Sequence, residues 1–186
     1  MIVAIQGEAA SFHHAAALKL LGPAIQLLSC NSFARTFETL MNGQADYAVV
    51  ATANTSYGAI DEVSDLLNQY RPHLLSKLWL PVEQCLIGLA GAHLADITHI
   101  YSHPVALQQC YNFLQTHLSH TKLVKHADTA GAVSDIVAWQ DKSKAAVASE
   151  LAAKEYDLPI LARQIQNDPH NQTHFILLGR TTSFPA

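Results

Sequence analysis

The chain has 186 residues, a net charge of −4 with histidine neutral, and 49% hydrophobic residues. This length suffices for one ordinary domain or two small lobes, and this composition supports a full core and excludes a disordered chain. The sequence shows no basic stripe, which excludes nucleic acid as the expected partner. It also contains no apolar run near the roughly 18 residues that a membrane span needs.

The cysteines and histidines give no metal-binding pattern. Cys30, Cys85 and Cys110 form no C-x-x-C pair, and the N-terminus begins directly with a strand pattern instead of a signal peptide. An odd number of cysteines in such a chain predicts reduced thiols and a cytoplasmic protein. The eleven histidines are scattered and are interpreted mainly as surface or helix-end residues.

The first half of the chain alternates short apolar runs with helix-like segments. Strands are predicted at residues 2–5, 25–30 and 47–52, and helices at residues 12–21, 33–41 and 60–67. Ser11 precedes the first helix, and Gly22 with Pro23 ends it. The β-α-β-α-β-α order indicates a largely parallel sheet that is covered by helices on both faces.

The second half repeats this alternation. Two strands, 74–80 and 84–90, lead into it; then come strands 97–102, 123–126 and 144–148, each followed by a helix, at 105–117, 129–139 and 149–156. Two last strands are predicted at 160–166 and 174–179. The predicted fold class is therefore α/β, with two three-layer α/β lobes around a cleft. The first lobe takes residues 1–80 and 158–186, and the second takes residues 81–157.

Polar residues follow several of the predicted strands, where helices begin. They are Ser11, Asn54, Thr55, Ser56, Ser102, His103 and Thr129. In open α/β sheets, ligands bind beyond the carboxyl ends of the strands, and free N–H groups at helix starts attract anions. These positions together predict a site for a small dianion, although each residue taken singly also fits an ordinary helix cap.

Six segments in register resemble the prephenate dehydratase family. The residues S-H-P-V-A-L-Q-Q-C at 102–110 resemble the family segment S-H-P-Q-A-L-x-Q-C, and N-Q-T-H-F at 171–175 resembles N-x-T-R-F. The other segments are 6–12, 49–58, 128–132 and 145–153. The resemblance thus covers nearly the whole chain.

The resemblance implies a fold like that of type II periplasmic binding proteins and a defined activity. The family converts prephenate to phenylpyruvate by decarboxylating dehydration in phenylalanine biosynthesis, and plant relatives act on arogenate. The family needs no metal or organic cofactor, and its members are commonly dimers or larger, so a cytoplasmic homo-oligomer acting on a small dianion is predicted. The match corresponds to the catalytic domain, without the regulatory ACT domain that many members carry.

The resemblance also assigns the candidate site residues. Thr173 matches the threonine that assists departure of the ring hydroxyl, a role that suits a hydrogen bond strengthening as charge develops. The predicted substrate-binding residues are Ser11, His13, Asn54, Thr55, Ser102, Gln109, Thr129, His174 and Phe175. In a regular strand Thr173 and Phe175 share one face and His174 takes the other, so an irregular backbone is expected where both Thr173 and His174 serve the site.

Five positions depart from the family pattern. His174 stands in place of arginine, Ala53 in place of glutamate, and Ala10 in place of a glycine; His13 and Val105 are the other two changes. His13 and His174 are expected to replace the missing cationic contact together. Two alternatives remain open: a divergent enzyme resembling prephenate decarboxylases, and a non-catalytic protein that binds a small anion.

Overall fold

The computed structural model describes residues 1–182 and consists of two compact units. The first contains Met1–Val82 and Asn171–Ala186, and the second contains Glu83–His170. The chain passes from the first unit to the second between residues 82 and 83, close to the expected boundary between residues 80 and 81. It returns to the first unit between residues 170 and 171, whereas the return was expected between residues 157 and 158. The reason is β10 (Ile160–Ala162), which pairs antiparallel with β6 (Cys85–Gly88) and therefore completes the second sheet.

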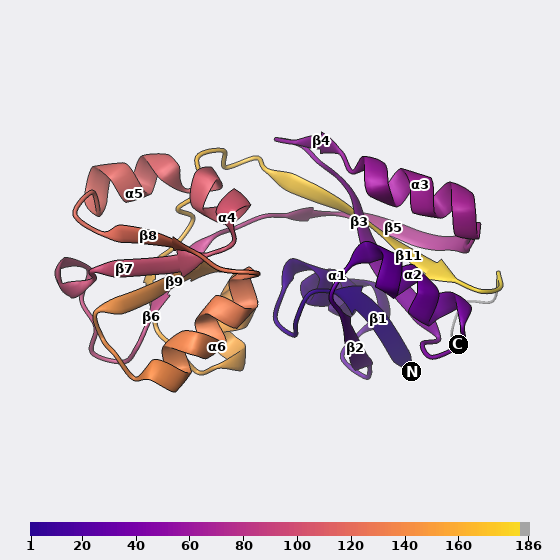
Figure 1. The fold of residues 1–186 in the computed structure, drawn as a ribbon, viewed down its shortest axis with the longest axis horizontal. Helices are drawn as coiled ribbons and strands as arrows, with labels where there is room; N and C mark the ends of the chain where they lie inside the picture. The colour runs from indigo at the N-terminus through magenta and orange to yellow at the C-terminus, as the bar shows by residue number, and fades with distance from the viewer. Residues whose placement is uncertain (183–186) are drawn as a thin grey trace. The chain divides into compact units, whose positions relative to one another are not determined.

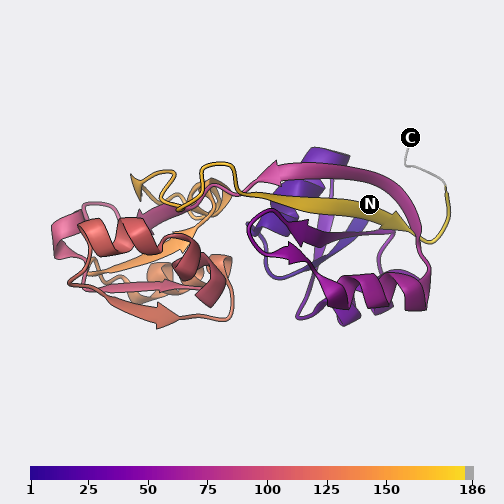
Figure 2. The same ribbon diagram turned by 90° about the horizontal axis from the view of Figure 1, so that it is seen from above.

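The first unit is built on a mixed sheet in the order β2-β1-β3-β11-β5, with the short β4 paired to β3 (Figure 1). Its strands are β1 (Ile2–Gln6), β2 (Gln26–Cys30), β3 (Tyr47–Asn54), β4 (Gly58–Ala59), β5 (His73–Pro81) and β11 (Gln172–Gly179). The pairs β1–β2 and β1–β3 are parallel, whereas β11 is antiparallel to both β3 and β5. Figure 2 shows β5 and β11 side by side along this unit. The predicted parallel pairing is therefore found for β1, β2 and β3, but the sheet as a whole is mixed. The reason is that no helix precedes β11 as a crossover connection, so β11 pairs in the antiparallel sense.

Helices cover both faces of this sheet. They are α1 (Phe12–Leu21), α2 (Phe33–Met41) and α3 (Asp61–Tyr70). The alternation of β-strand side chains separates two cores: Val49, Phe175 and Leu177 pack on the side of α1, whereas Val50 and Ile176 pack on the side of α2 and α3. Burial of these apolar faces supplies the main driving force for this unit.

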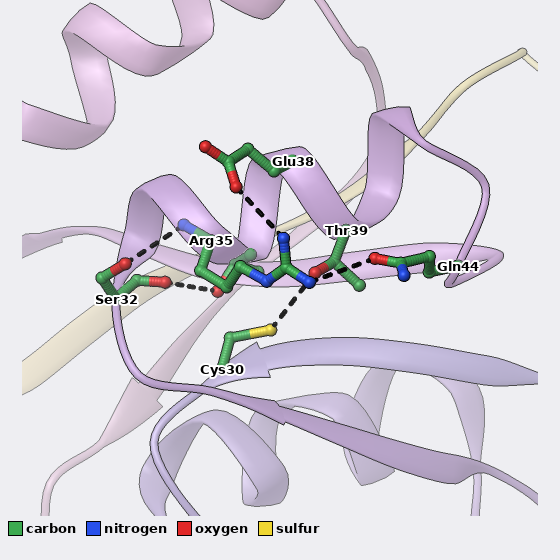
Figure 3. Close-up of polar contacts among 7 residues, drawn as sticks. Cys30, Ser32, Arg35, Glu38, Thr39 and Gln44 are labelled. Carbon is green, nitrogen blue, oxygen red and sulfur yellow. Dashed lines mark hydrogen bonds and ion pairs between the residues drawn. The ribbon is translucent and has the colours of Figure 1, made fainter.

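The start of α2 illustrates how local chemistry fixes a helix boundary (Figure 3). The hydroxyl of Ser32 accepts a hydrogen bond from Arg35 N at 3.1 Å, and Thr36 Oγ1 donates to Ser32 O at 2.9 Å. Arg35 pairs with Glu38 one turn further along, at 3.2 Å. The buried Cys30 thiol donates to Thr39 Oγ1 beneath the helix. These contacts are those of a capped surface helix, and an exposed ion pair adds less than about 1 kcal/mol.

The second unit has a five-stranded mixed sheet in the order β10-β6-β9-β7-β8. Besides β10 and β6, its strands are β7 (His99–Ser102), β8 (Lys122–Lys125) and β9 (Lys144–Ala148). The three strands β7, β8 and β9 are parallel, and β6 runs antiparallel to β9. The parallel part is the predicted β-α repeat. The helices are η1 (Leu94–Asp96), α4 (Pro104–Gln109), α5 (Tyr111–His117), α6 (Thr129–Trp139) and α7 (Glu150–Glu155).

One predicted helix, 105–117, is divided at Cys110 into α4 and α5. The cause is the side chain of Asn167, which enters the helical hydrogen-bond pattern. Its Nδ2 donates to Gln108 O at 3.0 Å, and its Oδ1 accepts from Asn112 N at 3.0 Å, so these two helix groups no longer bond to each other. A side chain inserted into the helical ladder is a common cause of a break. No sequence pattern within 105–117 indicates it.

The predicted fold class is confirmed: both units are α/β. The remaining differences are small: β10 ends at Ala162 instead of residue 166, and β4 and η1 were not predicted. Ala10 adopts a left-handed backbone with φ of 66°, the conformation that glycine adopts most easily. No helix within residues 1–182 combines the length and apolar character needed to cross a membrane.

Candidate functional site

The start of β11 and the end of β3 carry two polar side chains that are hydrogen-bonded to each other. Asn54, the last residue of β3, donates from Nδ2 to Thr173 Oγ1 at 2.9 Å. The other end of the Asn54 amide, Oδ1, accepts from Ser56 N at 2.9 Å, which fixes the direction of the amide. The Thr173 oxygen is therefore an acceptor in this pair, and no acceptor for its own proton lies among residues 1–182. The hydroxyl is left able to donate to a ligand.

Thr55 ties the loop after β3 to the start of β11. Its hydroxyl donates to Asn171 Oδ1 at 3.3 Å and accepts from Gln172 N at 2.9 Å. The backbone repeats the link, since Thr55 N donates to Gln172 O at 2.9 Å. Thr55 was predicted to bind substrate; its hydroxyl is engaged within the protein, where it holds Asn54 and Thr173 in place.

His174 lies on the opposite face of β11 from Thr173. Its Nδ1 is 2.6 Å from Thr52 Oγ1, and its ring packs against Trp79 with 4.9 Å between centroids. The expected irregularity is present, but it lies in β3: the pairing steps from His174 with Ala53 to Phe175 with Ala51, which leaves Thr52 as the extra residue. The bulge leaves Thr52 without a partner residue in β11, and its hydroxyl lies beside the His174 ring. The alternation of side chains along β11 is unchanged.

Two of the departures from the family pattern face each other. Ala53 and His174 are direct cross-strand partners, so the positions of the family glutamate and arginine are neighbours in the sheet. Side chains at opposed positions of an antiparallel pair interact directly. A glutamate and an arginine at these two positions would face each other as an ion pair, and this chain has neither residue. The imidazole of His174 contacts Thr52 and Trp79 instead.

His13, in the first turn of α1, is held against the same sheet on the other side. Its Nε2 accepts from Ala51 N at 3.2 Å, so the ring proton of the neutral form is on Nδ1. The ring meets Phe175 edge-on at 5.1 Å and Phe33 at 5.8 Å. Burial lowers the pKa of His13 from 6.5 to about 4. Phe175, which was predicted to bind substrate, is 1% exposed and supports His13 from the core.

The expectation that His13 and His174 together replace a cation is not met. Burial, followed by the charge of Lys77, also lowers the pKa of His174, so both rings are shifted toward the neutral form. The two rings also lie on opposite faces of the sheet, as their partners Phe175 and Trp79 show. Ser11, whose hydroxyl accepts from His14 N at 3.3 Å as the α1 cap, stands at the start of that helix.

Two of the three candidate residues of the second unit, Ser102 and Thr129, lie at or just after the carboxyl ends of parallel strands. Ser102 is fully buried and donates to Val147 O at 2.6 Å, which links β7 to β9. Thr129 is the first residue of α6, and its partly exposed hydroxyl has no partner within the described chain. The carboxylate of Asp128 caps this helix by accepting from Gly131 N, and it offsets part of the positive potential there.

Gln109 is the last residue of α4, at the helix break. Its Oε1 accepts from Gln84 Nε2 at 3.2 Å. Gln84 itself is 2% exposed. The sequence did not single out Gln84, Thr52 or Asn167; the one available signal was a polar residue opening the apolar run 84–90. Each of the three acts on a residue distant in the chain, which only the folded structure brings near.

Two mixed sheets with β-α-β repeats, joined by two crossing segments, define the class of two-lobed α/β proteins. At the level of fold alone, the chain is similar to a periplasmic substrate-binding protein from Coxiella burnetii, with a TM-score of 0.50 and 13% identity over 97% of this chain and 85% of that one. This likeness confirms the predicted type of fold.

The chain belongs to the prephenate dehydratase family, whose model matches residues 3–183. It is 38% identical, over 99% of its length and 48% of the relative, to "Arogenate dehydratase/prephenate dehydratase 2, chloroplastic" from Arabidopsis thaliana. A prephenate dehydratase from Arthrobacter aurescens, solved in complex with L-Phe, has a TM-score of 0.88 and 25% identity over 100% of this chain and 62% of that one. GqqA, described as a novel type of quorum quenching acylase, has a TM-score of 0.86 and 31% identity over 99% and 66%. The chain spans about half the length of the curated relatives.

Proposed function

We propose that the protein catalyses the decarboxylating dehydration of prephenate to phenylpyruvate, in the biosynthesis of phenylalanine. The observation that carries the proposal is the hydrogen bond from Asn54 Nδ2 to Thr173 Oγ1, at 2.9 Å. This bond orients the threonine hydroxyl as a hydrogen-bond donor at the start of β11. Membership of the prephenate dehydratase family supports the same assignment.

The reaction needs little more than a well-placed donor. The ring carboxylate leaves as carbon dioxide, its bonding electrons enter the ring, and the ring hydroxyl departs as water after one proton is taken up from solvent. Hydroxide is a poor leaving group, so a hydrogen bond that strengthens as its charge develops lowers the barrier. Thr173 supplies that bond. Asn54 makes the hydroxyl a better donor, because hydrogen bonds in a chain polarise one another.

The ligand contacts proposed for the second unit are made by Gln109 and Thr129. Both are partly exposed, and both have side-chain donors that are not used by the described residues. Ser102, Ser11 and His13 are proposed to support the site without touching the ligand, by fixing β7, the start of α1 and the central strand β3. Neutral amide and hydroxyl donors bind carboxylates less strongly than arginine does, so a moderate substrate affinity is expected.

The direct test is an assay of purified protein with prephenate at pH 8, in which phenylpyruvate is detected by its enol absorbance in alkali. Formation of phenylpyruvate that depends on protein concentration is the expected result. Arogenate is assayed in parallel, because the Arabidopsis relative carries both names. An N-acyl-homoserine lactone is included, because a relative from Komagataeibacter europaeus carries the name "Bifunctional N-acyl-homoserine lactone acylase/prephenate dehydratase". Turnover of the lactone without turnover of prephenate would overturn the proposal.

One observation favours a second candidate, a non-catalytic protein that binds a small anion. The pKa values of both His13 and His174 are lowered, mainly by burial, which disfavours the cationic contact implied by the family pattern. A thermal shift with prephenate but no consumption of it would support this candidate. Consumption of prephenate without phenylpyruvate would instead support a decarboxylase-like enzyme.

Location and assembly are further proposals. We infer a cytoplasmic enzyme, supported by three buried free cysteines and by reduced thiols being typical of that compartment. A homo-oligomer is proposed from the resemblance, and light scattering at several concentrations tests it. A monomer at all concentrations would exclude it.

A further inference from the structure

The second unit contains a buried carboxamide whose contacts the proposed function leaves unexplained. Gln84 stands next to the first crossing segment and is 2% exposed. Its backbone N–H donates to Gln166 Oε1 at 3.0 Å, and its carbonyl accepts from Ile165 N at 3.0 Å. The side chain is therefore anchored on a backbone that is itself bonded on both sides, and it has little freedom to turn.

The one side-chain bond that Gln84 makes is to Gln109. The donor is Gln84 Nε2 and the acceptor is Gln109 Oε1, at 3.2 Å. Because the Gln109 oxygen is occupied, the direction of its amide is set. Its two N–H groups point away from Gln84, and no acceptor for them is found in the described part of the chain. A carboxamide presented in this way offers donors only, which is what a carboxylate needs.

The backbone of Gln109 is fixed as well. Asn167 N donates to Gln109 O, and the Asn167 side chain bonds to Gln108 O and Asn112 N on either side of the helix break. Gln109 thus sits at the end of α4 with both its backbone and its side chain held by residues distant in sequence. A side chain held at both ends loses little entropy when it binds a ligand.

This arrangement leaves one defect. Gln84 Oε1 is buried and has no hydrogen-bond partner among residues 1–182. A buried unsatisfied oxygen destabilises a protein, and an apolar side chain of similar size at position 84 would avoid it. A destabilising group directly before the apolar strand β6 is explained if its other end serves the function.

We propose that Gln84 is a positioning residue, which orients the Gln109 amide so that its N–H groups bind a carboxylate of the substrate. The inference rests on the proposed function for the identity of the substrate. It assigns to Gln84 no contact with the substrate and no part in the chemical step. Its effect is on substrate binding alone, and it acts only through Gln109.

The test is a double-mutant cycle of Q84L and Q109L, with Q108L as the matched control. Gln108 is the exposed neighbour of Gln109 on the same helix, and only its backbone carbonyl makes a bond to Asn167. The dissociation constant for prephenate is measured by calorimetry in a T173V background, where turnover is expected to be about 100- to 1,000-fold slower. Losing a hydrogen bond to a charged group predicts that Q109L weakens binding roughly 10- to 100-fold, and Q84L about tenfold. The double variant should bind no worse than Q109L alone, and Q108L should bind normally.

A second measurement separates positioning from folding. Q84L removes the unsatisfied oxygen, so its melting temperature should equal or exceed that of the parent protein while its affinity falls. Additive losses in the double variant, or unchanged affinity in Q84L, would overturn the inference. A parent protein that neither binds nor converts prephenate would instead overturn the proposed function, a result that is visible before any Gln84 variant is made.

Discussion

The two units are built on the same β-α-β plan, yet they treat the polar residues at their strand ends differently. In the first unit, Thr173 lies on an antiparallel strand, accepts a bond from Asn54 and keeps its own proton available. In the second unit, the hydroxyl of Ser102 is fully buried and its proton goes to Val147 O. The first arrangement suits a group that responds to charge developing on a ligand, whereas the second suits a rigid support.

The difference follows from topology. The chain returns to the first sheet through β11, which runs antiparallel to β3. The start of β11 therefore lies beside the carboxyl end of β3, which brings the side chains of Asn54 and Thr173 together. In the second unit, the strand that runs antiparallel to β9 is β6, and it lies with its partner β10 on the far side of β9, away from β7 and β8. Its ligand candidates are therefore helix-end residues. We therefore expect variants of the first unit to alter turnover and variants of the second unit to alter substrate affinity.

The largest effect is expected at Thr173. T173V keeps the shape of the side chain but removes the donor, and loss of one such donor lowers kcat by about 100- to 1,000-fold. T173S, which retains the hydroxyl, should keep most of the activity. Steady-state kinetics with prephenate measure both variants, and thermal denaturation should show a loss of no more than about 1 kcal/mol in T173V. Equal activity of T173V and the parent protein would remove the distinction between the units.

The next effect concerns stability and acid. His13 has an ordinary pKa of 6.5 when unfolded and about 4 when folded, so between these values the unfolded state holds more protons. Its contribution is complete above pH 6.5 and is lost as the pH falls toward 4, by up to about 3 kcal/mol. H13L should flatten this part of the profile, measured by urea denaturation from pH 4 to 8. The matched variant of an exposed histidine, H73Q, should leave the slope unchanged.

A smaller effect is expected in the second unit. Q109L should raise KM about 10- to 100-fold with kcat within roughly twofold of the parent value, because the lost bond is made equally to substrate and transition state. Initial rates over a range of prephenate concentrations give the two constants. A fall in kcat with KM unchanged would place Gln109 in the chemical step and contradict the expected difference between the two units.

The smallest effect is expected at the pair of Ala53 and His174. H174R removes the contact with Thr52 and adds an unpaired cation, whereas A53E with H174R places opposite charges at directly opposed positions. Such a pair contributes roughly 0.2–1 kcal/mol. The double variant should therefore be more stable than the sum of the two single variants predicts, as measured by chemical denaturation. Strict additivity would show that the two side chains do not meet.

The sequence by itself determined most of the framework. The periodicity of apolar residues and the helix caps predicted α1, α2, α6 and β9 at the bounds that the structure shows, because these signals are local. The order of strands and helices predicted the α/β class. Motifs in register predicted Thr173 and its neighbour Asn54 as site residues. The expected irregular backbone at His174 is not found in β11, whose regular alternation places His174 on the opposite face from Thr173.

Only the tertiary structure decided how those residues are held. The contacts of Thr52 with His174, of Gln84 with Gln109 and of His13 with Ala51 join residues far apart in the chain. The break at Cys110 and the return boundary after His170 depend on Asn167 and β10 in the same way. Local propensity carries no information about such pairings, because they form only when packing brings the partners together. The pKa of His13 is likewise a property of its burial and not of its residue type.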